Sequence, residues 1–153
     1  MPSRHRSRQR ALQILYQLDL YKRPVDEAVS AFYDSLYSSE GETELEMEMT
    51  PPEQDTFMEL LVAGAAASAG DIDQTIGVHS AHWRLERMPA VDRNILRLAI
   101  FELMNENTPP AVIIDEALEL ARRFSGDDSV PFINGVLDAV RKQLSEKRES
   151  VGS

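Results

Sequence analysis

Cysteine is absent from the 153 residues of this sequence. Disulfide bonds and thiolate metal sites are therefore excluded, and a reducing cytoplasm is the natural setting for the chain. No apolar run approaches the roughly 20 residues that a membrane-spanning helix needs. The basic amino terminus is not followed by an apolar stretch ending in small residues, as a secretory signal would be. These absences predict a cytoplasmic protein without a membrane segment.

Strand patterns are missing as well, because apolar and polar residues do not alternate over any segment. Helical spacing recurs instead. With 42% hydrophobic residues, the chain is long enough to bury a real core. We predict an all-α fold, a compact bundle of six to seven helices. The expected helical faces cover residues 11–18, 25–36, 57–76, 91–104, 112–124 and 133–144.

Several signals mark where these helices start and how deeply they lie. Thr50, Pro51 and Glu53 match a capping box, so a helix is expected to begin there. The segment 91–104 is apolar on most sides, which places it at the centre of the bundle. Gly126 is expected to stop the helix that precedes it.

Positive charge is concentrated at the amino terminus of an acidic chain. The net charge is −10, but four of the 16 basic residues precede the first acidic residue. An acidic body repels polyphosphate at long range, so any contact with nucleic acid must be local. A solubilising tail is the alternative interpretation. The four basic residues are Arg4, Arg6, Arg8 and Arg10.

Alternating arginines would point to opposite sides of a helix, whereas an extended arm can turn all four toward one phosphate backbone. We therefore expect a flexible arginine-rich arm at residues 1–10 that orders on RNA, with Arg8 and Arg10 held by the first turn of the helix and Gln9 able to read a base edge. A helical domain is expected at residues 11–145 and a fraying polar tail at residues 146–153. Within the domain, the acidic segment 38–50 has no basic residue and is expected to form a mobile loop.

A second candidate surface for RNA lies at the start of the last predicted helix. Phe132 and Asn134 fall on the two flanks of its apolar stripe. An aromatic side chain there can stack on an unpaired base, while backbone amides of the helix start can meet phosphate. The alternative is that Phe132 packs beside the stripe and that Asp127, Asp128 and Ser129 act only as helix caps.

Signs of catalysis are lacking. There is no Gly-rich phosphate loop, Walker lysine or serine nucleophile motif. Asp115 and Glu119 have the spacing of a solvated helix face rather than of a general acid and base. His79, His82 and Glu86 can share a helix face, but a closed zinc site needs a further ligand and supporting hydrogen bonds. We therefore predict no enzyme, no cofactor and no metal site.

Three segments in combination resemble the NusB family of bacterial transcription antitermination factors. They are RALQILYQLDL at 10–20, VDRNILRLAIFEL at 91–103 and IIDEALELARRFSGDDSVPFINGVLD at 113–138. With the basic tip they span nearly the whole chain in family order, and the acidic segment 38–50 lies outside the resemblance. By this resemblance, residues 11–145 form a NusB-like helical domain of two packed helical subdomains.

The resemblance also implies a function. It implies binding of boxA, a short single-stranded element of nascent ribosomal RNA leader transcripts. It implies a partner, the small-subunit ribosomal protein NusE, and joint action on RNA polymerase against termination. Tyr16 and Asp92 match positions of the NusE interface, although a half-buried core tyrosine and a helix-start aspartate explain them equally well. The implied RNA-binding residues are Arg4, Arg6, Arg8, Arg10, Asp128, Ser129, Phe132 and Asn134.

Two other functions compete with this one. Some RNA cytosine methyltransferases begin with a similar helical domain, but such a chain is expected to continue into a Rossmann-like catalytic domain, and this one stops at Ser153. The chain could instead be a helical protein that self-associates without binding RNA. Some NusB-like chains are thought to form homodimers that bury their RNA surface, and in an RNA-binding chain such a dimer would be a resting form.

Overall fold

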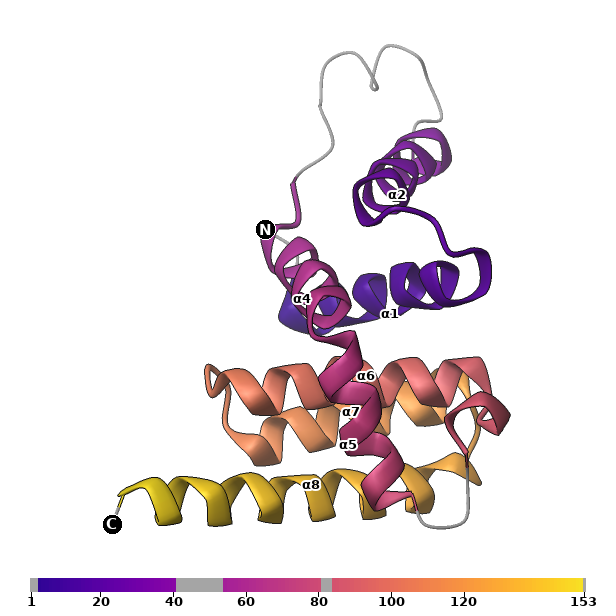
Figure 1. Ribbon diagram of the computed structural model, residues 1–153. Coiled ribbons are helices and arrows are strands. Elements are labelled where there is room, and N and C mark those ends of the chain that lie inside the picture. Colours follow the sequence, from indigo (N-terminus) through magenta and orange to yellow (C-terminus); the bar gives the residue numbers. More distant parts are fainter. Residues whose placement is uncertain (1–2, 41–53, 81–83, 153) are drawn as a thin grey trace. The chain divides into compact units, whose positions relative to one another are not determined.

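The computed structural model describes residues 3–40, 54–80 and 84–152 of the chain. Within these ranges the regular elements are seven α-helices and one 3₁₀ turn, without a strand (Figure 1). The predicted all-α fold is confirmed. Among the helices described, none combines the length and apolar character that crossing a membrane requires.

The chain divides into two compact units, Met1–Ala63 and Gly64–Ser153. Unit 1 contains the first two helices and most of α4, and unit 2 contains the rest. The helices of unit 1 are α1 (Arg4–Tyr21), α2 (Val25–Glu40) and α4 (Thr56–Ala67), whose last turn belongs to unit 2. Unit 2 continues with α5 (Ala69–His79), the 3₁₀ turn η1 (Leu85–Arg87), α6 (Ala90–Asn105), α7 (Pro110–Phe124) and α8 (Ser129–Gly152).

Helix α1 starts earlier than expected. The side chain of Ser3 caps it by accepting a hydrogen bond from the Arg6 backbone N–H at 3.1 Å. Residues 4–10 therefore form the first two turns of a helix instead of the expected flexible arm. Most of the predicted core face of this helix is buried in unit 1. Ala11, Leu12, Ile14 and Leu15 are buried, whereas Leu18, which was predicted to belong to the same face, is half-buried.

Helix α4 begins at Thr56 because the preceding aspartate provides its cap. The Asp55 carboxylate accepts a hydrogen bond from the backbone N–H of Met58 at 3.0 Å, which satisfies one of the free donors of the first turn. The capping box expected at residues 50–53 lies outside the described residues. So does most of the expected acidic loop, since α2 continues to Glu40.

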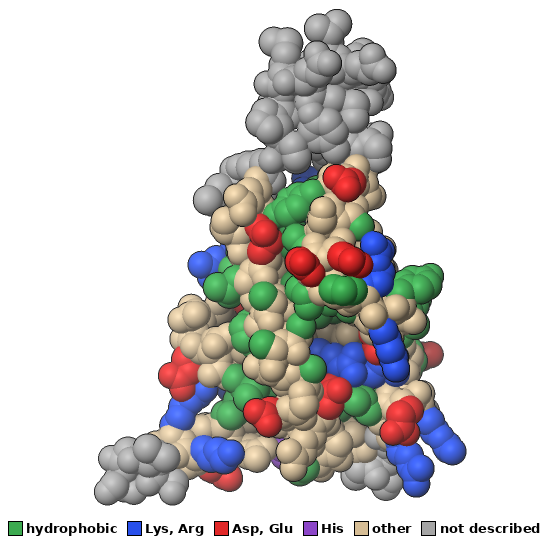
Figure 2. Space-filling model, turned by 45° about the horizontal axis from the view of Figure 1, so that its top comes forward, with side chains coloured by type: hydrophobic (Ala, Val, Ile, Leu, Met, Phe, Trp, Pro, Cys, Tyr) green, Lys and Arg blue, Asp and Glu red, His purple; other side chains and the backbone are tan. Residues whose placement is uncertain are grey.

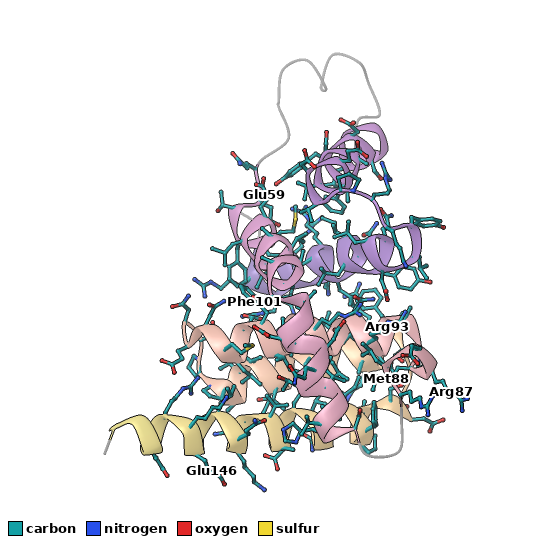
Figure 3. All side chains as sticks on the ribbon, viewed as in Figure 1. Glu59, Arg87, Met88, Arg93, Phe101 and Glu146 are labelled. Carbon is teal, nitrogen blue, oxygen red and sulfur yellow. The ribbon has the colours of Figure 1, made fainter. Side chains whose placement is uncertain are left out.

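Helix α6 is the most deeply buried helix of unit 2, as its apolar residues predicted. It packs against α5, α7 and α8 (Figure 1). Its first turn is held by Arg93, which donates to the carbonyls of Leu85 and Met88 at 3.1 and 3.2 Å (Figure 3). The buried apolar residues of α6 are Ile95, Leu96, Leu98, Ala99, Ile100 and Leu103.

The predicted end of α7 is confirmed, whereas the predicted end of the last helix is not. Gly126 ends α7 as expected, with a φ of +146° and its N–H bonded to the carbonyl of Ala121 at 2.8 Å. Helix α8, however, continues to Gly152 where a fraying tail was expected from residue 146. Arg148 donates to the Leu103 carbonyl at 3.0 Å and pairs with Glu106, so α8 is tied to the end of α6.

Candidate nucleic-acid interface

Asp55 is the centre of a polar cluster in unit 1. Its carboxylate is only 2% exposed. Besides the Met58 backbone, it accepts hydrogen bonds from the Ser7 hydroxyl at 2.7 Å and from the Arg10 guanidinium at 3.1 Å. The Arg10 side chain keeps 12% of its surface exposed. One buried carboxylate thus joins the start of α1 to the start of α4.

Phe57 engages two more of the amino-terminal arginines. The guanidinium carbons of Arg4 and Arg8 lie 4.6 and 5.3 Å from the centroid of its ring, within the range of cation–π attraction. Arg8 is only 3% exposed. Of the four arginines, Arg4 and Arg6 are exposed, whereas Arg8 and Arg10 are held inside unit 1.

Two neighbours of this cluster complete its hydrogen bonds. The Gln9 amide lies 3.0 Å from the ring nitrogen of His5, one helical turn away. The Tyr33 hydroxyl donates to Glu59 at 3.0 Å and accepts from the Asp55 N–H at 2.9 Å. Burial raises the pKa of Tyr33, and the nearby Glu59 carboxylate adds to that rise.

In unit 2, a carboxylate and two hydroxyls join the starts of α6 and α8. Asp92 is 4% exposed and accepts hydrogen bonds from the hydroxyls of Ser125 and Ser129, the latter at 2.8 Å. The two hydroxyl oxygens lie 2.8 Å apart. Because both serines meet the same buried carboxylate, the turn between α7 and α8 has a defined position over the start of α6.

The remaining predicted RNA residues of unit 2 surround this turn. Asp128 and Asn134 are exposed, and Phe132 is half-buried. Ser129 uses its hydroxyl on Asp92, a contact with a distant element that the capping interpretation did not include. Figure 2 shows acidic and basic side chains interspersed on the face of the molecule that it presents.

The candidate metal ligands are placed only in part. His79 lies 2.6 Å from the side-chain oxygen of Gln143 on α8, which makes it a helix-end histidine with a hydrogen-bond partner. Glu86 is exposed on η1, and His82 lies outside the described residues. Within the described ranges, no three acidic or histidine side chains come close enough to hold a metal ion.

The NusB family model matches residues 5–142 of the chain. The chain belongs to the NusB family. Its relatives include the transcription antitermination protein NusB of Solibacter usitatus (strain Ellin6076), which is 53% identical over 146 residues. That alignment covers 95% of this chain and 93% of the relative. The family expected from the sequence is confirmed.

Solved structures of NusB proteins share the fold. T. maritima NusB superposes with a TM-score of 0.73 at 29% identity, and the match covers 92% of each chain. A crystal structure of the antitermination factors NusB and NusE in complex with double-stranded RNA contains a chain with a TM-score of 0.71 and 25% identity. The match covers 93% of this chain and 99% of that one.

In this NusB-family chain, Tyr16 lies on an exposed part of α1, and Leu20, one turn later, is exposed beside Tyr21. Sequence reasoning singled out Tyr16 alone. Leu20 lies outside the apolar face predicted for residues 11–18, and an apolar residue off the core face is the sequence signal that could have indicated an exposed contact surface beside Tyr16. Asp92, the other residue matched to the NusE interface, is buried, and its carboxylate accepts hydrogen bonds from Ser125 and Ser129.

Proposed function

We propose that this chain is a transcription antitermination factor that binds boxA RNA together with NusE and acts on RNA polymerase. Membership of the NusB family over residues 5–142 carries this proposal. The likeness to a chain of the structure of NusB and NusE in complex with double-stranded RNA supports RNA and NusE as partners of this chain. The role needs no catalysis, and it places the protein in the cytoplasm with the nascent transcript.

The proposed RNA surface of unit 1 is the exposed side of the start of α1. Arg4 and Arg6 are exposed there and would bind phosphate, which arginine contacts through two nitrogens at once. Arg8, Arg10 and Gln9 contribute by holding this turn of the helix in place through Phe57, Asp55 and His5. Helical order before binding removes part of the entropy cost that a flexible arm would incur.

The proposed RNA surface of unit 2 is the start of α8. Asp128, Ser129, Phe132 and Asn134 supply polar groups and one aromatic ring at this place. For NusE, the exposed Tyr16 with Leu20 offers an apolar contact on α1, since aromatic anchors dominate such interfaces.

Binding of boxA and of a scrambled RNA, each with and without NusE, tests this function. We expect tighter binding to boxA, and a further gain when NusE is present. Equal affinity for both RNAs in the presence of NusE would overturn the proposal. Light scattering in the same mixtures identifies the self-association alternative, in which a homodimer persists whatever RNA is added.

A matched pair of variants tests the share of α1 in this surface. Arg6→Gln removes one exposed charge and is expected to lower the salt slope of boxA binding by about 0.7. Arg23→Gln removes an exposed charge from the turn after α1 and is expected to leave the slope unchanged. If the two variants behave alike, the start of α1 does not contact phosphate.

A further inference from the structure

Two arginines and a phenylalanine lie exposed in the last turn of α7. Phe124 has 45% of its surface exposed, although it ends a helix whose other large apolar residues are mostly buried. The guanidinium carbon of Arg123 lies 5.4 Å from the centroid of its ring. Arg122 pairs with Glu119 at 3.4 Å, but both side chains are exposed, so water competes for this contact.

The turn after Phe124 brings these residues next to the start of α8. Ser125 follows Phe124 directly and shares the carboxylate of Asp92 with Ser129. The last turn of α7 therefore has a defined position beside Ser129, the first residue of α8. That position adjoins the residues through which the start of α8 is proposed to bind boxA.

The chemistry of the three residues fits unpaired RNA. A base can stack on an exposed aromatic ring, and arginine both binds phosphate and stacks on bases. Cations at a helix carboxyl end are favoured by the helix dipole, but the dipole does not account for an exposed aromatic ring beside them. Asp127 and Asp128 in the same turn offset the positive charge, so the turn does not attract polyphosphate at long range.

We propose that Arg122, Arg123 and Phe124 form one surface, the α7-end surface, that binds the single-stranded RNA held at the start of α8. Phe124 stacks on a base, and the two arginines contact the phosphates beside it. This inference rests on the proposed function. It also supplies cations in unit 2, which complements the finding that Arg8 and Arg10 are held within unit 1.

Neutralising the arginines tests their contact with phosphate. The double variant Arg122→Gln/Arg123→Gln is expected to lower the salt slope of boxA binding, measured with NusE present, by about 1.4, since each phosphate contact to a single strand contributes about 0.7. Arg141→Gln/Lys142→Gln is the matched control. It removes two exposed charges from α8 about 18 Å along the helix from Ser129 and is expected to leave the slope unchanged.

Replacing the ring tests stacking separately. Phe124→Leu keeps an apolar side chain but cannot stack, and it is expected to weaken boxA binding about five-fold or more without changing the salt slope. Phe124→Tyr is expected to retain wild-type affinity. An equal loss in both variants would indicate altered packing of the turn and would contradict stacking.

The outcomes distinguish this inference from the function on which it rests. If the wild-type chain selects boxA while the arginine and Phe124→Leu variants bind as tightly and with the same slope, the α7-end surface does not bind RNA although the proposed function stands. If the variants instead lose affinity for NusE in the absence of RNA, the surface contacts protein and the inference is overturned. A wild-type chain that does not select boxA overturns both.

Discussion

Replacing Asp55 with alanine is expected to destabilise unit 1 more than replacing any exposed carboxylate. The variant removes the acceptor of three hydrogen bonds at once, from Ser7, Arg10 and the Met58 backbone. The Ser7 hydroxyl is buried and Arg10 is nearly so, hence water cannot fully replace the lost carboxylate.

The expected loss follows from these contacts. Removing one member of a buried ion pair costs about 3–5 kcal/mol, and losing a helix cap costs about 1 kcal/mol. The two effects overlap because the same carboxylate is responsible, so we expect about 3–5 kcal/mol in total. For a chain of this size that corresponds to a melting temperature lower by about 6–20 °C. Asp55→Asn preserves a good cap but loses the charge, and should cost about 1–3 kcal/mol.

Urea denaturation followed by circular dichroism measures these losses, and a double-mutant cycle with Arg10→Met isolates the ion pair. The coupling energy between Asp55 and Arg10 is expected to be about 1.5–3 kcal/mol. A loss below about 1 kcal/mol for Asp55→Ala, or a coupling energy near zero, would refute the view that this carboxylate holds the start of α1 in place. Asp34→Ala, an exposed carboxylate on α2, serves as the control.

Further predictions concern a close approach, a titrating group and a buried carboxylate. A Cβ at Gly64 would overlap the Phe101 ring (Figure 3), so Gly64→Ala should lower the free energy of unfolding by about 1–2 kcal/mol. Gly77 has open space around it, so Gly77→Ala should raise the free energy of unfolding by up to about 1 kcal/mol. Similar values for the two variants would contradict the close packing of Gly64 against Phe101. The pKa of Tyr33 is raised by burial, so its contribution to stability is present below about pH 10 and lost as pH rises through the raised pKa. Urea denaturation at alkaline pH should show this loss in the wild type but not in Tyr33→Phe, and an identical pH dependence would exclude it. Asp92→Ala removes the carboxylate that accepts from the hydroxyls of Ser125 and Ser129, so it should lower the free energy of unfolding by about 1–3 kcal/mol. It should also weaken boxA binding. Unchanged affinity would mean that the turn between α7 and α8 keeps its position without this carboxylate.

Local signals account for most of what the sequence predicted correctly. Apolar residues on most sides of segment 91–104 placed α6 at the centre of unit 2, because only a buried helix can satisfy such a pattern. Gly126 ended α7 because glycine adopts a positive φ without strain. Three segments in the order typical of the family were together enough to indicate the family that the comparisons confirm.

Local signals did not predict the helical conformation or the side-chain partners of the arginines at the start of the chain. Their alternation favoured an extended arm, but Ser3 caps a helix and Phe57 and Asp55 receive three of the four side chains. Asp55 is 45 residues from Arg10 along the chain, and nothing in the local sequence marks the two as partners.

The sequence by itself determined most of the helical segments and their buried faces, since spacing and caps act within a few residues. It did not show that α1 starts at Arg4, that the segment 57–76 is divided between α4 and α5, or that α8 continues to Gly152. Only the tertiary structure decided which polar groups meet. Ser125 and Ser129 reach Asp92 across 33 and 37 residues, and Arg148 reaches the Leu103 carbonyl across 45. Such pairs depend on the packing of whole helices against one another, and the sequence pattern of a short segment does not predict that packing.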